Sequence, residues 1–356
     1  MSTVIPLHRS LFTAAETTVL MSGDYTVTAR TYDSGVESLT VRNSRGYVEV
    51  LPFMGQIIWD AAFDGISLRM DNMFRQPKPV SAIQDTYGCF AFHSGLLAAG
   101  CPAPEDDHPL HGEFPCAPMD SAELALHEDG ALTVRSSHEY VMGFGHHYLA
   151  TPSVTLAPGS GLFTIGLRVK NLSAYAPMPL QYMCHMNYAF VPEGRMSDNL
   201  APGSFALRRT VPAHVHPTPE WERINERILS GEYDADSLAG AEAFDPEIVY
   251  FADDLPRQTS RAEFALTRPD GTTFVTRFDT AQFPVATRWI LHNPDQKVAA
   301  FVLPGTSRPE GFLAAEKAGT LIHLNAGEER TFEVETGLLR ATEAASSTTQ
   351  PAQSKE

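Results

Sequence analysis

Two histidines with the capacity for proton transfer stand in unlike local settings. His111 lies in the turn-rich stretch HPLHGE at 108–113, and His185 lies in the apolar, strand-like stretch QYMCHMNY at 181–188. An apolar setting lowers the pKa of an imidazole, toward a group that exchanges protons near neutral pH. A carboxylate, Glu310, follows in the loop GTSRPEG at 305–311. Two imidazoles and a carboxylate suit general acid–base catalysis on a neutral substrate.

Two further side chains accompany these groups. Asn187 follows His185 by two residues, and alternate residues of a strand share one face, so we expect both on the same side. Arg308 precedes Glu310 in its loop and is a candidate for contacts with substrate hydroxyls. The alternative for each histidine is an ordinary hydrogen-bonded side chain. The alternative for Glu310 is a solvated loop carboxylate.

The elements that must position these residues are predicted to be strands. Apolar residues alternate with polar ones, which is typical of strands with one buried face, over 25–32, 39–42, 47–51, 132–135, 162–169, 274–278 and 331–336. Turn sequences rich in Gly, Asn, Asp and Pro separate these runs at short intervals. The pattern predicts a mainly antiparallel all-β fold, either a sandwich or a barrel.

Two regions depart from this pattern. Residues 198–245 are predicted to form a long excursion that borders a site and carries a helix from Pro219, with Thr218 as its N-cap. The tail at 341–356 lacks large apolar residues and is predicted to be disordered. Residues 1–340 are predicted to form a single domain.

Composition excludes several classes of protein. The formal charge is −17, with 43 acidic and 26 basic residues, which disfavours binding to nucleic acid. No apolar run approaches the ~20 residues of a membrane span, and Pro6, His8 and Arg9 interrupt any signal-like apolar run. We therefore expect a cytoplasmic protein. The four cysteines form no CxxC pair, so neither disulfides nor a zinc ribbon are expected.

The chain resembles the aldose 1-epimerase (galactose mutarotase) superfamily, and specifically its poorly characterised aldose-1-epimerase-like branch. The resemblance covers residues 40–340 and depends on five features, namely His111-Gly112, His185 with Asn187, FDPEIVY at 244–250, RPEG at 308–311, and LNAGE at 324–328. It implies a large β-sandwich, a supersandwich of the galactose mutarotase type, with a small helical insertion at 215–231. The family has an arginine before the first histidine. This chain has Phe90-Ala-Phe92-His93 there, so His93 or Arg75 is expected to serve instead.

The resemblance also implies a mechanism. Glu310 takes the proton of the anomeric hydroxyl, and His185 as imidazolium protonates the ring oxygen, so that the sugar ring opens to the aldehyde. Rotation about C1–C2 and reclosure yield the other anomer. His111 hydrogen-bonds near the ring oxygen, while Asp245, Arg308, His93 and Asn187 are expected to bind substrate. No cofactor and no metal is needed, and the expected partner is a small sugar bound by a monomer or homodimer.

Three other functions remain open on the sequence. The protein could be a carbohydrate-binding protein or sensor that has no catalytic activity. His214, His216 and Glu220 reproduce the HxHxxxE core that cupins use to bind a divalent metal, although Pro217 and Pro219 favour a turn into the helix there. A polysaccharide-active enzyme on a similar supersandwich is the third alternative.

Overall fold

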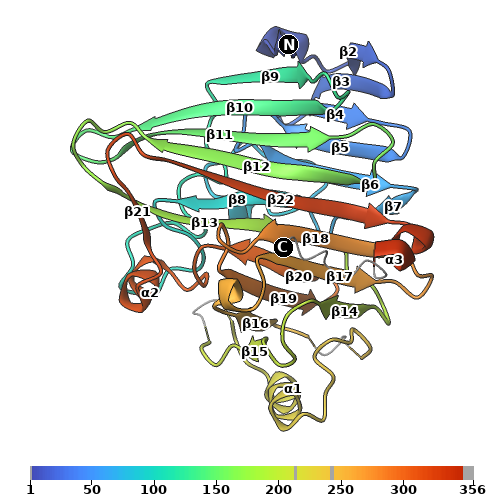
Figure 1. Cartoon of the computed structure of the whole chain (residues 1–356), viewed down its shortest axis with the longest axis vertical. Coiled ribbons are helices and arrows are strands. Elements are labelled where there is room, and N and C mark those ends of the chain that lie inside the picture. The colour runs from blue at the N-terminus through green and yellow to red at the C-terminus, as the bar shows by residue number, and fades with distance from the viewer. Residues whose placement is uncertain (1, 212–214, 241–243, 348–356) are drawn as a thin grey trace, which may run out of the picture.

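Two large antiparallel sheets make up the protein (Figure 1). The computed structural model describes residues 2–211, 215–240 and 244–347. In the part of the chain described, the nine-stranded sheet contains, in spatial order, β1 (Thr3–Pro6), β9 (Ser121–Leu126), β10 (Leu132–Val141), β11 (His147–Leu156), β12 (Leu162–Asn171), β22 (Glu329–Leu339), β18 (Thr273–Asp279), β17 (Arg261–Thr267) and β14 (Arg195–Asp198).

The second sheet has thirteen strands within the same described ranges. Its order is β15 (Ala206–Leu207), β16 (Ile248–Ala252), β19 (Val285–His292), β20 (Lys297–Gly305), β13 (Met178–Met186), β8 (Ala91–Leu96), β6 (Ile57–Phe63), β5 (Gly46–Leu51), β4 (Glu37–Arg42), β3 (Tyr25–Thr31) and β2 (Thr17–Ser22). Two short strands lie off this path, β21 (Ile322–Leu324) beside β13 and β7 (Ile66–Ser67) beside β6. The all-β prediction is confirmed, and each run of alternating residues lies on a strand.

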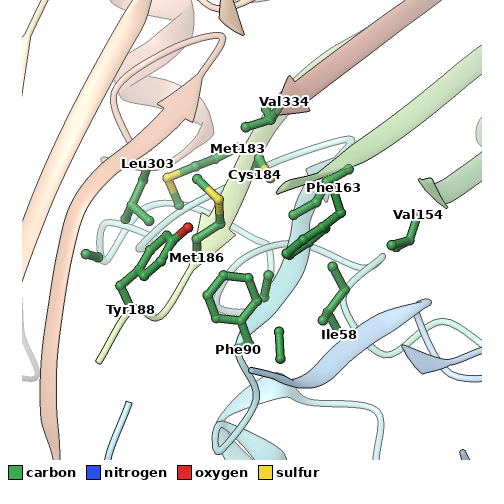
Figure 2. Packing of buried hydrophobic residues seen from close by; sticks show 14 of the residues in the cluster. Ile58, Phe90, Val154, Phe163, Met183, Cys184, Met186, Tyr188, Leu303 and Val334 are labelled. Carbon is green, nitrogen blue, oxygen red and sulfur yellow. The ribbon is translucent and has the colours of Figure 1, made fainter. Parts of the chain in front are cut away.

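The core lies between the two sheets, because each strand turns alternate side chains inward. Along β11, half-buried and buried positions alternate over all ten residues. Phe163 of β12 lies 6.0 Å from Phe63 of β6 and 6.1 Å from Phe90, measured between ring centroids, so aromatic packing joins the sheets. Figure 2 shows Phe163 and Phe90 in this layer together with Cys184 and Met186 of β13.

The predicted helix is present as α1 (Pro219–Ser230) in the excursion between β14 and β16. The Thr218 hydroxyl accepts a hydrogen bond from the Trp221 backbone N–H, and Gly231 ends the helix in the left-handed conformation. The other α-helices are α2 (Phe312–Ala318) and α3 (Ala341–Ser347), and 3-10 turns occupy Arg9–Leu11, Ile83–Thr86 and Leu255–Arg257. None of the described helices is long and apolar enough to cross a membrane.

The C-terminal tail differs in part from its prediction. Residues 341–347 form α3, where Glu343 lies 3.0 Å from the Arg45 guanidinium. This ion pair joins α3 to the body of the protein, a contact that the small side chains of the segment do not predict. Residues 348–356 lie outside the described residues.

Candidate active site

A cavity of about 500 Å³ lies on the face of the thirteen-stranded sheet that is turned away from the core. Cys184 and Met186 pack in the core, so the residue between them, His185, emerges on the opposite face. The same alternation on three strands of this sheet supplies much of the lining, with Met183 and His185 from β13, Thr287, Trp289 and Leu291 from β19, and Val249 and Phe251 from β16. Loop residues complete the wall, including Phe74, Tyr87, Leu110, His111 and Arg208.

His185 sits in a cluster of rings at the base of this cavity. Its imidazole stacks on Phe92 with centroids 4.5 Å apart and planes 14° apart. The His111 ring lies 4.9 Å away and the Trp289 ring 5.7 Å away, both edge-on. The Tyr87 hydroxyl lies 3.1 Å from His185 Nε2. The two predicted histidines are therefore neighbours in one aromatic enclosure.

The surroundings hold His185 in its neutral form. Burial lowers its pKa well below the usual 6.5, and the nearby His111 lowers it further because two protonated rings repel each other. The Asn187 side chain opposes this shift and favours the charged ring. Burial raises the pKa of Tyr87 well above 10, so its hydroxyl remains protonated beside the imidazole. At neutral pH, His185 is a proton acceptor.

The His111-Gly112 pair fits a tight loop. His111 has a φ of 65°, its N–H donates to the Gly100 carbonyl, and its own carbonyl accepts from the Gly95 N–H. Gly112 has a φ of 84°, and a Cβ there would lie 2.1 Å from the Ala98 carbonyl oxygen, so only glycine fits. The buried Ser94 hydroxyl lies 3.1 Å from His111 Nδ1 and fixes the ring.

Asp245 also borders the cavity, as an exposed residue ahead of β16. Its carboxylate accepts a long hydrogen bond of 3.4 Å from the Asn293 amide, and Asn293 lines the cavity as well. Of the seven residues predicted for the site, His111, His185 and Asp245 are thus brought together.

Glu310 and Arg308 do not line the cavity. The Glu310 carboxylate accepts a hydrogen bond of 2.9 Å from Thr210 Oγ1, and it lies 3.9 Å from the Arg308 guanidinium. Arg308 forms an ion pair with Asp253 and covers the ring of Phe251 from 4.8 Å. Both side chains are engaged beside the cavity, because the loop after β20 turns them toward these partners.

His93 and Asn187 point elsewhere too. His93 alternates with Phe92 on β8 and therefore faces the core, where its Nδ1 lies 2.8 Å from the Tyr182 hydroxyl. The Asn187 amide donates to the Cys89 carbonyl at 3.0 Å. Neither Asn187 Oδ1 nor His185 Nδ1 has a hydrogen-bond partner among the described residues. Neither His93 nor Asn187 reaches the cavity lining.

The burial of His93 leads to a prediction about acid stability. Burial lowers its pKa to about 3, whereas an unfolded histidine titrates near 6.5. Between these values only the unfolded chain takes up the proton, so the free energy of unfolding falls as pH decreases from 6.5, by up to about 1.4 kcal/mol per pH unit. His93→Gln should remove this contribution in chemical denaturation at pH 7, 6 and 5. The exposed His8→Gln is the matched control, and an unchanged slope in His93→Gln would contradict the prediction.

The cupin-like alternative receives no support from the described residues. His214 lies outside them, His216 is exposed, and Glu220 forms an ion pair with Arg223 on the surface of α1. Within 2–211, 215–240 and 244–347, no group of three or more His, Cys, Asp or Glu side chains is arranged to hold a metal ion.

The sequence analysis missed several cavity residues. Tyr87 and Arg208 stand in segments without a recognisable motif, and loops bring them to the site. Glu247 lies in the FDPEIVY segment, where only Asp245 was expected to bind substrate. The signal available for Glu247 was its spacing, because it precedes Val249 and Phe251 at intervals of two in a strand-like run.

The two sheets form a β-sandwich whose fold is similar to that of aldose 1-epimerase-like and galactose mutarotase-like structures. A Klebsiella pneumoniae structure provisionally described as an aldose 1-epimerase matches with a TM-score of 0.77 and 15% identity, covering 99% of this chain and 97% of that one. A galactose mutarotase-like protein from Clostridium acetobutylicum matches with a TM-score of 0.61 and 12% identity, covering 89% and 99%. Galactose 1-epimerase from Lactobacillus acidophilus matches with a TM-score of 0.54 and 10% identity, covering 95% and 98%.

The family assignment is more specific than the fold. Residues 33–338 match the family described as a domain of unknown function, DUF4432, and the chain belongs to this family. A search of curated proteins gives no match. The predicted relationship to a poorly characterised branch of the mutarotases is confirmed.

Proposed function

We propose that this protein is an aldose 1-epimerase-like isomerase that interconverts the α and β anomers of an aldose or a modified hexose. The observation that carries the proposal is the pair of imidazoles, 4.9 Å apart between centroids, in a cavity of about 500 Å³. Ring opening needs one group that takes a proton from the anomeric hydroxyl and one that gives a proton to the ring oxygen. Two neighbouring imidazoles meet this need when only one of them is protonated.

The electrostatics suggest which histidine plays which part. His185 is neutral at neutral pH, and a proton on His111 disfavours a second one on His185. In our proposal His185 Nε2 accepts the proton of the anomeric hydroxyl. The C1–O5 bond then breaks, its electron pair goes to O5, and O5 takes a proton from His111. Before the sugar binds, the Tyr87 hydroxyl holds Nε2 in position.

These roles differ from those expected from the sequence, in which His185 is the acid and Glu310 the base. Burial makes His185 a poor carrier of a proton in the resting site, and the Glu310 carboxylate lies outside the cavity. After rotation about C1–C2, His185 returns its proton to the carbonyl oxygen and His111 takes a proton back from the O5 hydroxyl. O5 then bonds to C1 and closes the ring as the other anomer. The cycle leaves both rings as they began.

Anomer exchange by NMR tests the proposal. The purified protein is added to freshly dissolved or equilibrated aldoses, with modified and acidic hexoses in the same panel, and exchange between α and β signals is measured. Acceleration of any sugar above the spontaneous rate supports the isomerase. Saturable sugar binding without acceleration favours the carbohydrate-binding alternative. The position of Glu310 outside the cavity favours this alternative as well, because Glu310 was the expected base. New reducing ends from oligosaccharides would point to the polysaccharide-active alternative.

The pH dependence of exchange should follow the neutral form of His185. Because its pKa is lowered well below 6.5, kcat/KM should not begin to decline near pH 6.5 as the pH is reduced from 7.5, and should fall only at more acid pH. If His185 acted as the acid instead, kcat/KM would still be rising at the acid end of the profile, where the protonated form of His185 increases. A pH profile between 5 and 8.5 distinguishes the two assignments, provided that spontaneous exchange is subtracted at each pH.

A further inference from the structure

Glu247 is a carboxylate of the cavity lining that is buried, whereas Asp245 in the same lining is exposed. Glu247 immediately precedes β16, and its side chain lies on the same face as Val249 and Phe251 because these residues alternate. Only 9% of the residue is exposed. A buried carboxylate is costly unless donors compensate it, so its partners show how it is retained.

An aromatic donor, Trp289, and a cationic donor, Arg208, fix the orientation of the Glu247 carboxylate. The Trp289 indole N–H donates to Glu247 Oε2 at 2.6 Å, and the Arg208 guanidinium donates to Oε1 at 2.8 Å. Arg208 and Trp289 line the same cavity. The Trp289 ring in turn packs edge-on against His185 and Tyr87, at 5.7 and 6.1 Å. A rigid chain of contacts therefore links the carboxylate to the imidazole pair.

This arrangement suits recognition of a polyhydroxylated ligand. A carboxylate has about four lone-pair sites for hydrogen bonds, so it can accept from ligand hydroxyls while it keeps its donors in the protein. Hydrogen bonds to ionised groups are stronger than those between neutral groups. With Arg208 as donor and Glu247 as acceptor side by side, the pair is complementary to two adjacent hydroxyl groups, one accepting and one donating.

We propose that Glu247 is the substrate-binding carboxylate of this site, and that with Arg208 it grips a pair of adjacent sugar hydroxyls and so orients the anomeric carbon toward His185 and His111. This inference rests on the proposed function. It assigns to Glu247 a contact with substrate and no proton transfer. Glu310, which the sequence favoured as the carboxylate of the site, has no such part.

The test compares Glu247→Gln with Glu310→Gln, two isosteric changes that each remove one negative charge. For the aldose that the wild-type protein binds best, calorimetric Kd and the KM and kcat for anomer exchange are measured. We expect Glu247→Gln to raise Kd and KM by about 10- to 100-fold, the range for a lost charged hydrogen bond. Glu310→Gln should stay within about threefold, as should Glu316→Gln on the exposed side of α2.

Two additional variants separate binding from a structural role. Trp289→Phe removes the indole donor but retains an aromatic ring. If Glu247 merely anchored Trp289, this change would cost as much affinity as Glu247→Gln, and the proposal would be overturned. Glu247→Asp keeps the charge while withdrawing it by one methylene, and its Kd should rise less than that of Glu247→Gln. If Glu247→Gln does not fold, Glu247→Asp is measured in its place. A wild-type Kd in Glu247→Asp would then count against the proposal.

The outcomes distinguish the two proposals. If the wild-type protein binds sugar without accelerating exchange, the isomerase proposal fails while the comparison of Kd values still tests Glu247. If exchange is accelerated and Glu247→Gln leaves Kd and KM unchanged, the role of Glu247 is refuted and the isomerase stands. If no aldose binds and none is accelerated, both are wrong.

Discussion

Replacement of His185 by alanine should lower kcat/KM for anomer exchange by about 10²- to 10⁴-fold, the usual contribution of a positioned acid–base group. No other described group is as well placed to take its part, because Tyr87 keeps its proton and Asn187 turns to the Cys89 carbonyl. The residual rate should approach spontaneous exchange. NMR exchange at pH 7.5, with the sugar concentration varied on both sides of KM, gives kcat and KM separately.

The loss should appear in kcat, because the imidazole acts on the reacting atoms. Calorimetric binding of the sugar should change much less than the rate. His147→Ala provides a control, since this histidine pairs with Glu139 at the start of β11, outside the cavity lining. A His185→Ala protein that retains its fold and exchanges anomers at the wild-type rate would remove His185 from the mechanism.

Some features of the candidate site depend only on a short stretch of sequence, and others depend on contacts between distant segments. The strand that carries His185 and the loop that carries His111 were recognisable because each is defined by its own residues. The strand has an apolar, strand-like run, and the loop has the His111-Gly112 pair. Their adjacency is not local, since it requires β8 to pair with β13 and the loop to fold back onto Gly95 and Gly100. The family resemblance supplied that adjacency, and alternation by itself did not.

The carboxylates show the opposite case. Glu310 stands in a conspicuous Pro-Gly loop, yet the orientation of that loop depends on contacts with Thr210 that no spacing encodes. Glu247 stands immediately before a strand whose five residues are all buried, a setting in which a charged side chain is unusual. It is tolerated because Arg208 and Trp289 come to it from other segments, as buried charges require. In this chain, a charged residue at the entry to a buried strand was therefore a better indication of a cavity residue than one in a loop.

The same reasoning applies to His93 and Asn187. A shift of one residue along a strand moves a side chain to the other face, so His93 lies in the core although its neighbour Phe92 supports His185. Asn187 shares the parity of His185 but follows the last residue of β13, where regular alternation ends. Sequence parity predicts a face only as far as the strand extends.

The second large effect concerns stability, which depends on the core between the two sheets. Phe163→Ala should lower the free energy of unfolding by about 3–5 kcal/mol, because it leaves a cavity between the sheets where the ring now contacts Phe63 and Phe90. This is a large part of the 5–15 kcal/mol that holds typical domains folded. Urea denaturation at pH 7.5 measures it. Phe144→Ala, at a fully exposed turn position, should change stability by no more than about 0.5 kcal/mol.

Phe163→Leu tests whether the loss arises from the cavity. Leucine refills part of the space, so its cost should fall clearly below that of alanine, and equal costs for the two would point to a lost aromatic contact instead. Below the unfolding transition, Phe163→Ala should keep sugar binding and exchange near wild-type values. Its side chain lies in the core layer (Figure 2) and is not among those that line the cavity. His185→Ala should show the reverse pattern, with activity lost and the fold retained. If Phe163→Ala instead abolished exchange while still folded, the placement of the imidazole pair would depend on packing across the sheet through Phe90, which contacts Phe163 and directly precedes β8.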